Sequence, residues 1–201
     1  MRWKVVTGVV ASVFIASLGM AILRADHDHD RPGQIVDRHD RDDDDDARVA
    51  TGFLYARQQG IKLDLKHKDK EVVGLGSYLV NAVGGCNDCH TAPPYTKDPY
   101  AALGAPKQIN NACYLAGGQT FGPFVSRDIT PFENGMPAGL TFNQFKHVIR
   151  TGEDPDHPGQ LLQVMPWPVY QTMTDSDLRA IYEYLDSIPP IAQNTCGAPS
   201  E

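Results

Sequence analysis

Hydrophobic side chains recur at helical spacing in three stretches of this 201-residue chain. The first stretch follows Asp69, a good N-cap residue, and ends at Gly84-Gly85. Its apolar positions are Val72, Val73, Leu75, Leu79, Val80 and Val83. Gly76 lies inside this predicted helix, where glycine costs about 1 kcal/mol relative to alanine, so we expect a close helix crossing there.

Two further helices are predicted towards the C-terminus. Thr141-Phe142-Asn143-Gln144 matches a capping box and opens a helix that Gly152 ends. Thr174-Asp175-Ser176-Asp177 caps the last helix, which Pro189-Pro190 stop. Residues 91–140 are rich in proline and glycine, and no segment alternates convincingly as a strand. The predicted fold class is therefore all-α with a long, loop-rich middle.

The N-terminal segment is patterned for export. After the basic start Met1-Arg2-Trp3-Lys4, residues 5–23 contain no charge. This length lies at the boundary between a secretory signal and a membrane anchor, since a spanning helix needs about 20 apolar residues. We expect residues 1–25 to be a signal peptide or an uncleaved anchor, and the rest of the chain to leave the cytoplasm.

The next segment, residues 26–48, is polar throughout. Residues 26–46 hold ten Asp, three His and three Arg. Such a sequence buries too little apolar surface to offset its ordering entropy, so we predict a disordered linker. Its Asp residues with His29 and His39 could bind divalent cations weakly, but a solvated spacer is the favoured interpretation. Residues 49–201 then form one domain.

The charge balance bears on the partner. The formal net charge is −7, and the predicted domain is mildly acidic by itself. An acidic surface repels phosphate backbones, so the sequence argues against a nucleic-acid partner.

The segment Cys86-Asn87-Asp88-Cys89-His90 has the spacing of a covalent haem attachment site. Each cysteine can add to one vinyl group of a porphyrin, and the adjacent histidine can bind the iron. A zinc site would want four ligands, and no second CxxC or suitable histidine pair is present. A thioredoxin-like redox pair would want a strand before it and a helix after it. A disulfide between Cys86 and Cys89 would close an unusually small loop.

Two cysteines remain, Cys113 and Cys196. In an oxidising compartment they could form a disulfide, and otherwise they are unrelated free thiols. We favour the disulfide because these are the only two thiols left over.

A haem iron bound to His90 has one further axial position. Met165 is the favoured ligand, because the prolines in Met165-Pro166-Trp167-Pro168 keep the chain extended and out of the next helix. Other candidates are Met136, Met173, His147 and His157. We expect the two histidines to be exposed, since one lies on the helix after the capping box and the other in a polar loop.

Together these features resemble a class I c-type cytochrome, and more closely the cytochrome c domains associated with bacterial periplasmic dehydrogenases. The motifs that carry the resemblance, besides CxxCH, are Ser126-Arg127-Asp128-Ile129-Thr130-Pro131, Leu140-Thr141-Phe142, Arg150-Thr151-Gly152, Met165-Pro166-Trp167-Pro168-Val169-Tyr170, Met173-Thr174-Asp175 and Ala180-Ile181-Tyr182-Glu183-Tyr184-Leu185. The resemblance covers about residues 70–190. It implies a cytochrome c-like fold around one haem c, with Cys86, Cys89, His90 and Met165 as haem sites. The chain departs from multi-haem subunits in having a single CxxCH.

The function predicted from these features is single-electron transfer in the periplasm, by an electron carrier rather than an enzyme. The carrier would be soluble or anchored through residues 5–23, and would pass electrons between a dehydrogenase and a terminal oxidase or another cytochrome. Arg127 could pair with a haem propionate, while Trp167 and Tyr170 would cover the porphyrin. The alternatives are a peroxidase-like haem enzyme and a haem-based gas sensor with a displaceable sixth ligand.

Overall fold

The computed structural model describes residues 38–97, 107–192 and 195–196, with side chains from residue 44 onward. These residues belong to one compact unit, 36–201. The predicted signal or anchor, and the predicted linker up to residue 37, lie outside the described residues. Within those ranges, no helix combines the length and the apolar character needed to cross a membrane.

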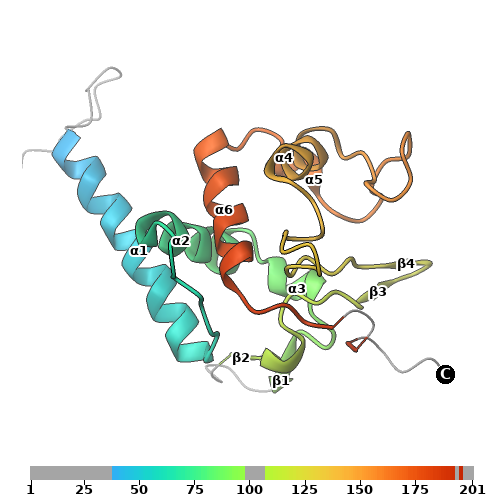
Figure 1. The fold of residues 1–201 in the computed structure, drawn as a ribbon, viewed down its shortest axis with the longest axis horizontal. Coiled ribbons are helices and arrows are strands. Elements are labelled where there is room, and N and C mark those ends of the chain that lie inside the picture. Colours follow the sequence, from blue (N-terminus) through green and yellow to red (C-terminus); the bar gives the residue numbers. More distant parts are fainter. Residues whose placement is uncertain (1–37, 98–106, 193–194, 197–201) are drawn as a thin grey trace, which may run out of the picture. The chain divides into compact units, whose positions relative to one another are not determined.

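The described part of the chain is mostly helical (Figure 1). Its helices are α1 (Arg38–Gln59), α2 (Lys70–Tyr78), the π-helical turn η1 (Leu79–Val83), α3 (Cys86–His90), the 3-10 turn η2 (Asn111–Cys113), α4 (Phe142–Thr151), α5 (Trp167–Tyr170) and α6 (Asp175–Ser187). Its strands are β1 (Tyr95–Lys97), β2 (Gln108–Ile109), β3 (Thr120–Phe121) and β4 (Phe124–Val125).

The strands require a correction to the predicted fold class. They form two antiparallel pairs, β1 with β2 and β3 with β4, so the unit is mostly helical but not all-α. Strands of two or three residues are too short to show an alternating pattern. They arise because backbone N–H and C=O groups in the loop-rich middle must find partners. The β3–β4 turn is Gly122-Pro123, with Gly122 in the left-handed region at φ 59°.

Helix α1 differs from the expectation for the acidic linker. It begins at Arg38, so residues 38–48 are helical and the predicted domain start at residue 49 falls inside a helix. Extending an existing helix costs much less than nucleating one. Packing of the C-terminal half of α1 against α2 provides the nucleus, and the Arg48 guanidinium pairs with Asp45 one turn earlier.

Helix α2 begins where the sequence predicts. The side chain of Asp69 accepts hydrogen bonds from the backbone N–H groups of Glu71 (3.0 Å) and Val72 (3.4 Å). The helix continues as η1 and ends at Gly84, and Gly85 then turns the chain in the left-handed region at φ 59°. This turn leads directly into α3, which carries the CxxCH segment.

The N-terminal caps of the two later helices are confirmed. Thr141 and Gln144 form the predicted capping box of α4, and Gly152 ends that helix at φ 71°. Thr174 accepts a hydrogen bond from the Asp177 N–H and so caps α6. That helix ends at Ser187, just before the predicted Pro189 stop.

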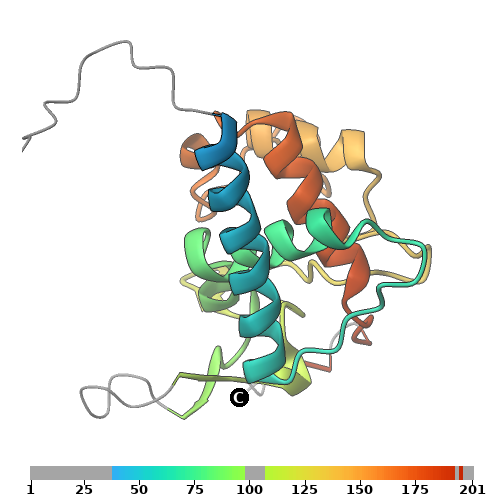
Figure 2. The same cartoon turned by 90° about the vertical axis from the view of Figure 1, so that its left-hand side faces the viewer.

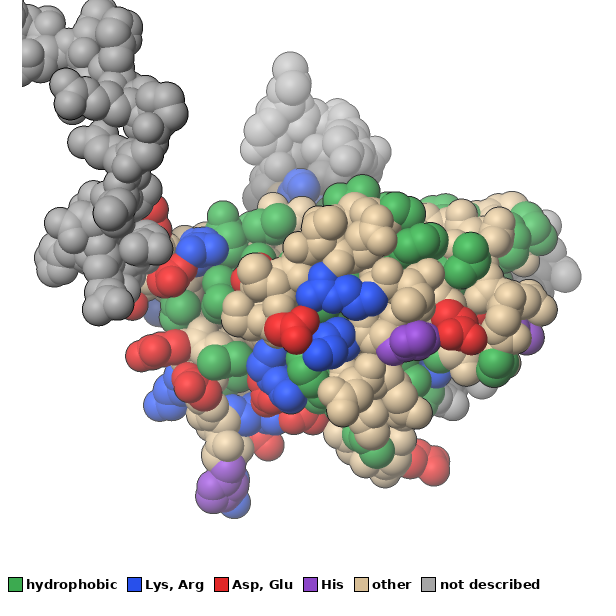
Figure 3. All heavy atoms as spheres, turned by 90° about the horizontal axis from the view of Figure 1, so that it is seen from above, with side chains coloured by type: hydrophobic (Ala, Val, Ile, Leu, Met, Phe, Trp, Pro, Cys, Tyr) green, Lys and Arg blue, Asp and Glu red, His purple; other side chains and the backbone are tan. Residues whose placement is uncertain are grey.

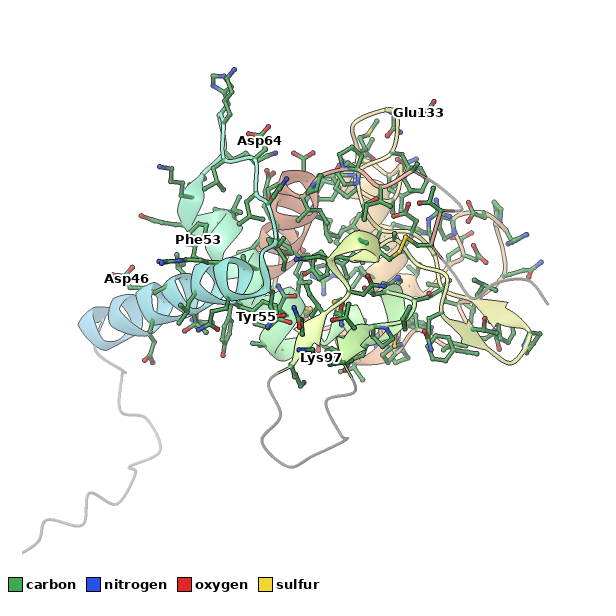
Figure 4. The ribbon with its side chains drawn as sticks, turned by 90° about the horizontal axis from the view of Figure 1, so that it is seen from below. Asp46, Phe53, Tyr55, Asp64, Lys97 and Glu133 are labelled. Atoms are coloured by element: carbon green, nitrogen blue, oxygen red, sulfur yellow. A yellow bond between two sulfur atoms is a disulfide. The ribbon has the colours of Figure 1, made fainter. Side chains whose placement is uncertain are left out.

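Glycines allow α2 to cross its two neighbouring helices closely. A Cβ atom on Gly52 of α1 would lie 2.0 Å from the Gly74 carbonyl oxygen of α2, and one on Gly76 would lie 1.9 Å from the Ala180 carbonyl oxygen of α6. The expected close crossing at Gly76 is therefore confirmed. Figure 2 shows α2 running across α1 and α6. Phe53 of α1, labelled in Figure 4, also packs against Gly74, since a Cβ atom on Gly74 would lie 2.7 Å from its ring.

A disulfide and a buried polar network complete the core. The predicted Cys113–Cys196 disulfide is present, with its Cα atoms 5.6 Å apart, and joins η2 to the C-terminal segment. Tyr114 donates its hydroxyl hydrogen to the Asn81 side-chain oxygen (2.6 Å), and the Asn81 amide donates to the Tyr184 hydroxyl (3.2 Å). Because each polar group finds a partner, the network ties η1 to α6 at little desolvation cost.

The crossing at Gly76 gives a first prediction. The change Gly76→Ala places a methyl group against the α6 backbone, so we expect the free energy of unfolding to fall by about 3 kcal/mol, as for an overpacked core. Chemical denaturation measures this quantity. Glu71→Ala, at an exposed position on the same helix, is the control. A Gly76→Ala variant as stable as the wild type would contradict the close crossing.

Candidate functional site

A cavity of about 850 Å³ opens beside α3. Its wall is formed by α3, the β3–β4 hairpin, α4, the segment 154–166, α5 and α6, and is mostly apolar. Figure 1 shows α3 near the middle of the unit, with the hairpin extending to one side and α4 and α5 above it. The volume is in the range of cofactor sites. The predicted site residues that line the cavity are Cys86, Cys89, His90, Arg127, Met165 and Tyr170.

The two thiols of α3 are free and partly buried at the cavity wall. Desolvation raises the pKa of Cys86 to about 12 and also raises the pKa of Cys89. A thiol–disulfide oxidoreductase needs the opposite, a lowered thiol pKa that yields a reactive thiolate. The geometry therefore disfavours a redox-active cysteine pair and leaves two neutral thiols facing the cavity.

Two polar residues that the sequence analysis did not single out fix the CxxCH turn. The Asn87 amide donates to the Pro94 carbonyl oxygen (3.1 Å), and its side-chain oxygen accepts from the Thr91 hydroxyl (2.9 Å). The Thr91 oxygen in turn accepts from the Leu115 N–H (2.9 Å). Asn87 and Thr91 are both buried, so this network anchors α3 on its side away from the cavity. The sequence feature that could have indicated this network is Thr91, a small hydroxyl residue directly after CxxCH.

The imidazole of His90 is held in one tautomer. Its Nδ1 lies 2.7 Å from the Arg127 carbonyl oxygen, and because a carbonyl can only accept, Nδ1 must carry the hydrogen. The Nε2 lone pair is then free. Desolvation lowers the pKa of His90, which favours the neutral ring. A neutral imidazole whose second nitrogen is hydrogen-bonded to a carbonyl is the usual form of a metal-binding histidine.

The side chain of Arg127 lies at the edge of the cavity. One guanidinium nitrogen pairs with Asp156, and the other donates to the Ala138 carbonyl oxygen (2.9 Å). Its buried Nε has no hydrogen-bond partner. An unpaired buried donor is costly, so this nitrogen fits a site that receives an anionic group at the cavity edge.

Two of the candidate methionines line the cavity. Met165 lies in the segment 161–166, which we call the methionine strap, and Met173 lies just before α6. Met136 is not among the cavity-lining residues. The favoured ligand and one alternative therefore both line the cavity that the α3 thiols also line.

The two aromatic residues of α5 have different surroundings. The Tyr170 hydroxyl donates to the Gly84 carbonyl oxygen (3.0 Å), and its ring lines the cavity. The indole of Trp167 lies over Gly152 instead, and Trp167 is not among the lining residues. The structure thus brings Tyr170 to the cavity but not Trp167.

The candidate histidines are exposed, as expected. His147 pairs with Glu153 (2.8 Å), and His157 pairs with Asp154 (3.1 Å). His157 nevertheless borders the cavity mouth, as do Asp154 and Asp156. Within the described ranges, no group of three or more His, Cys, Asp or Glu side chains is arranged to hold a metal ion.

Charged side chains also gather on the α4–α6 face, which Figure 3 views from above. Lys146 and Arg150 of α4 both pair with Asp175 at the start of α6 (3.0 and 2.8 Å). The guanidinium of Arg179 lies 3.5 Å from the centre of the Phe142 ring. These contacts join α4 to α6 outside the cavity and so stabilise one of its walls.

Comparisons with known proteins connect this geometry to a group of redox subunits. No protein-family profile matches the chain. The cytochrome c subunit of a quinone-dependent alcohol dehydrogenase from Gluconacetobacter polyoxogenes is 28% identical over 129 residues, 62% of this chain and 24% of that protein. The chain is similar to cytochrome c subunits of bacterial dehydrogenases.

Further relatives agree with this cytochrome similarity. The cytochrome subunit of a fructose dehydrogenase from Gluconobacter japonicus is 28% identical over 117 residues, 56% of this chain and 20% of that subunit. The Gluconobacter oxydans alcohol dehydrogenase cytochrome c subunit is 30% identical over 146 residues, 65% of this chain and 27% of that subunit. The chain thus corresponds to about a quarter of the length of these relatives.

The carboxylate beside Arg127 gives a prediction about pH. Desolvation raises the pKa of Asp128 in the folded chain, and its buried Oδ2 has no partner. The unfolded chain therefore loses this proton at lower pH, and the folded state loses stability as the pH rises from the unfolded-state pKa of about 4 towards the folded-state value. Asp128→Asn keeps an Oδ1 acceptor for Thr130 without the charge.

We expect the stability of Asp128→Asn relative to the wild type to increase between about pH 3 and about pH 7, measured as the free energy of unfolding in urea. Asp64→Asn removes an exposed carboxylate on the loop after α1 (Figure 4) and is the control. A stability difference that stays constant with pH would contradict the desolvated state of Asp128.

Proposed function

We propose that the chain is a periplasmic electron-transfer protein carrying one covalently bound haem c. The observation that carries the proposal is that CxxCH in α3 and Met165, 75 positions after His90 in the sequence, line one mostly apolar cavity. The similarity to cytochrome c subunits supports the cofactor and the electron-transfer role. The protein would act as an electron carrier, either by itself or as a subunit of a dehydrogenase complex, and not as a catalytic subunit.

A haem in this cavity would supply a one-electron couple. Cys86 and Cys89 would hold it through two thioether bonds, formed by adding each neutral thiol across a vinyl group. His90 would bind the iron through Nε2, while its Nδ1–H bond to the Arg127 carbonyl orients the ring and raises its basicity.

Met165 would supply the second protein ligand to the iron. A thioether ligand favours the reduced iron, so it raises the potential relative to two histidines. The apolar cavity wall acts in the same direction, because excluding water disfavours the more highly charged oxidised state. The unpaired Nε of Arg127 is suited to donate to a haem propionate. Tyr170 would cover the porphyrin, whereas the position of Trp167 suits a role outside the cavity.

The rim of the cavity suits a protein partner. Large, exposed hydrophobic side chains of the described residues concentrate there, and those that line the cavity are Phe124, Val125, Leu161 and Val164. Small apolar patches around a redox group are typical of transient electron-transfer contacts. We propose a dehydrogenase subunit as the electron donor and a terminal oxidase or another cytochrome as the acceptor, with residues 5–23 directing export and serving as a signal or an anchor.

The axial ligand gives the decisive test of this function. Oxidised holoprotein should show the weak red charge-transfer band of a methionine–iron(III) bond. Met165→Ala should abolish the band and lower the reduction potential by on the order of 100 mV. Met173→Ala, which alters the other methionine that lines the cavity, should keep the band and is the matched control.

Other results would point elsewhere. Loss of the band in Met173→Ala alone would show that the iron ligand is Met173 and not Met165. A high-spin iron that readily binds cyanide or carbon monoxide would favour a peroxidase-like enzyme or a gas sensor. A purified, exported chain whose mass includes no porphyrin would contradict the proposal as a whole.

The apolar rim gives a prediction for electron exchange. Self-exchange between oxidised and reduced copies requires the cavity mouths to approach, so Val125→Glu and Leu161→Glu should slow it by about tenfold through like-charge repulsion and desolvation. Leu54→Glu makes the same charge change at an exposed position on α1 and should have little effect. The rates are measured by NMR line broadening of mixtures. Equal slowing by all three variants would mean that net charge, and not the rim, controls the encounter.

A further inference from the structure

The strongest unexplained contact outside the cavity is between Trp167 and Gly152. A Cβ atom built on Gly152 would lie 2.2 Å from Cε2, 2.3 Å from Cδ2 and 2.4 Å from Nε1 of the indole. The ring therefore lies directly against the glycine Cα, in space that any other residue would fill. Gly152 is buried and ends α4, so the indole rests on a rigid part of the fold.

This contact is connected to the methionine strap at both ends. The Leu162 N–H donates to the Gly152 carbonyl oxygen (2.8 Å), which fixes the start of the strap on the same glycine. The Trp167 N–H donates to the Met165 carbonyl oxygen (2.8 Å), which fixes Met165 relative to the indole. Gly152 thus contacts the residues on either side of Met165, although it does not line the cavity itself.

The last residue of α5 is hydrogen-bonded to the segment just before α3. The Tyr170 hydroxyl donates to the Gly84 carbonyl oxygen (3.0 Å), two residues before Cys86. Helix α5 has four residues, so the indole contact and the tyrosine hydrogen bond hold it along its whole length. These two contacts relate the position of Met165 to that of the CxxCH turn.

We propose that Gly152 and Trp167 are positioning residues that hold the Met165 thioether at the cavity. The indole packed on the bare glycine backbone sets where the strap ends, and the Gly152 carbonyl sets where it begins. This inference rests on the proposed function for the role of Met165 as a ligand, but the seating of the strap is a property of the polypeptide alone. A ligand held in advance loses little freedom when it binds.

A methyl group at position 152 tests the proposal. Gly152→Ala would push the indole away and release the strap, but it would also strain a left-handed residue. Gly135→Ala separates the two effects, because Gly135 has nearly the same backbone angle (φ 73° against 71°) with nothing within 4 Å of its added Cβ. Both variants carry the conformational strain, and only Gly152→Ala carries the clash.

Two measurements on the holoprotein compare these variants with the wild type. In Gly152→Ala, we expect the Leu162 and Trp167 amides to exchange hydrogen about tenfold faster. We also expect added imidazole to bind the iron about tenfold more tightly, because a larger fraction of molecules has the methionine detached. Gly135→Ala should stay within about twofold of the wild type in both measurements.

Substitutions of Trp167 test the proposal independently. Trp167→Ala should reproduce both changes, and Trp167→Phe should partly restore the wild-type values because a ring still packs on the glycine. In the Trp167→Ala background, adding Gly152→Ala should change little further, since no indole remains to be displaced. Additive effects of the two changes would overturn the proposal.

The outcomes distinguish this inference from the proposed function. If Gly152→Ala matches Gly135→Ala in amide exchange and in imidazole binding, the positioning role is wrong even where the wild type shows its methionine band. If the wild type lacks that band, the proposed ligation is wrong, while amide exchange in the strap still decides whether Gly152 and Trp167 seat it.

Discussion

The hydrogen bond from His90 Nδ1 to the Arg127 carbonyl oxygen is the contact on which the rest of the site depends. At 2.7 Å it fixes the tautomer, points Nε2 away from the backbone and joins α3 to the segment that carries the Arg127 side chain. The same residue thus orients the imidazole through its main chain and borders the cavity with its guanidinium. A displacement of residues 126–128 would alter both effects together.

The helical framework explains how that contact is kept in place. Helix α2 is pressed between α1 and α6 through Gly74 and Gly76, where backbone lies against backbone. Since α2 runs through η1 into α3, the close crossings determine where the CxxCH turn begins. The hydrogen bonds among Asn81, Tyr114 and Tyr184 then tie η1 to α6 and to the chain after η2. A packed and hydrogen-bonded support of this kind allows little rearrangement around the CxxCH turn.

The sequence predicted the structure correctly where a feature depends on residues that are adjacent in the chain. Caps such as Asp69 and the Thr141 box depend on a few adjacent residues, and the structure has both. The β3–β4 hairpin was missed because Gly122-Pro123 was interpreted as loop chemistry alone. The helical start of α1 was missed because its stability comes from contact with α2. The packing of Trp167 on a glycine fifteen positions earlier leaves no sequence pattern, since nothing in composition or period links the two residues.

The pairing of Cys113 with Cys196 has a consequence for biogenesis. If the chain is exported and takes up haem as proposed, two of its sulfurs must be oxidised to cystine while Cys86 and Cys89 stay reduced. Oxidation and exchange proceed through thiolates. The raised pKa of Cys86, about 12, keeps the thiolate fraction of this residue very small once α3 has formed. Folding around the helical crossings would therefore protect Cys86 from the oxidants that close the Cys113–Cys196 disulfide, so the order of these steps would matter for the proposed haem attachment.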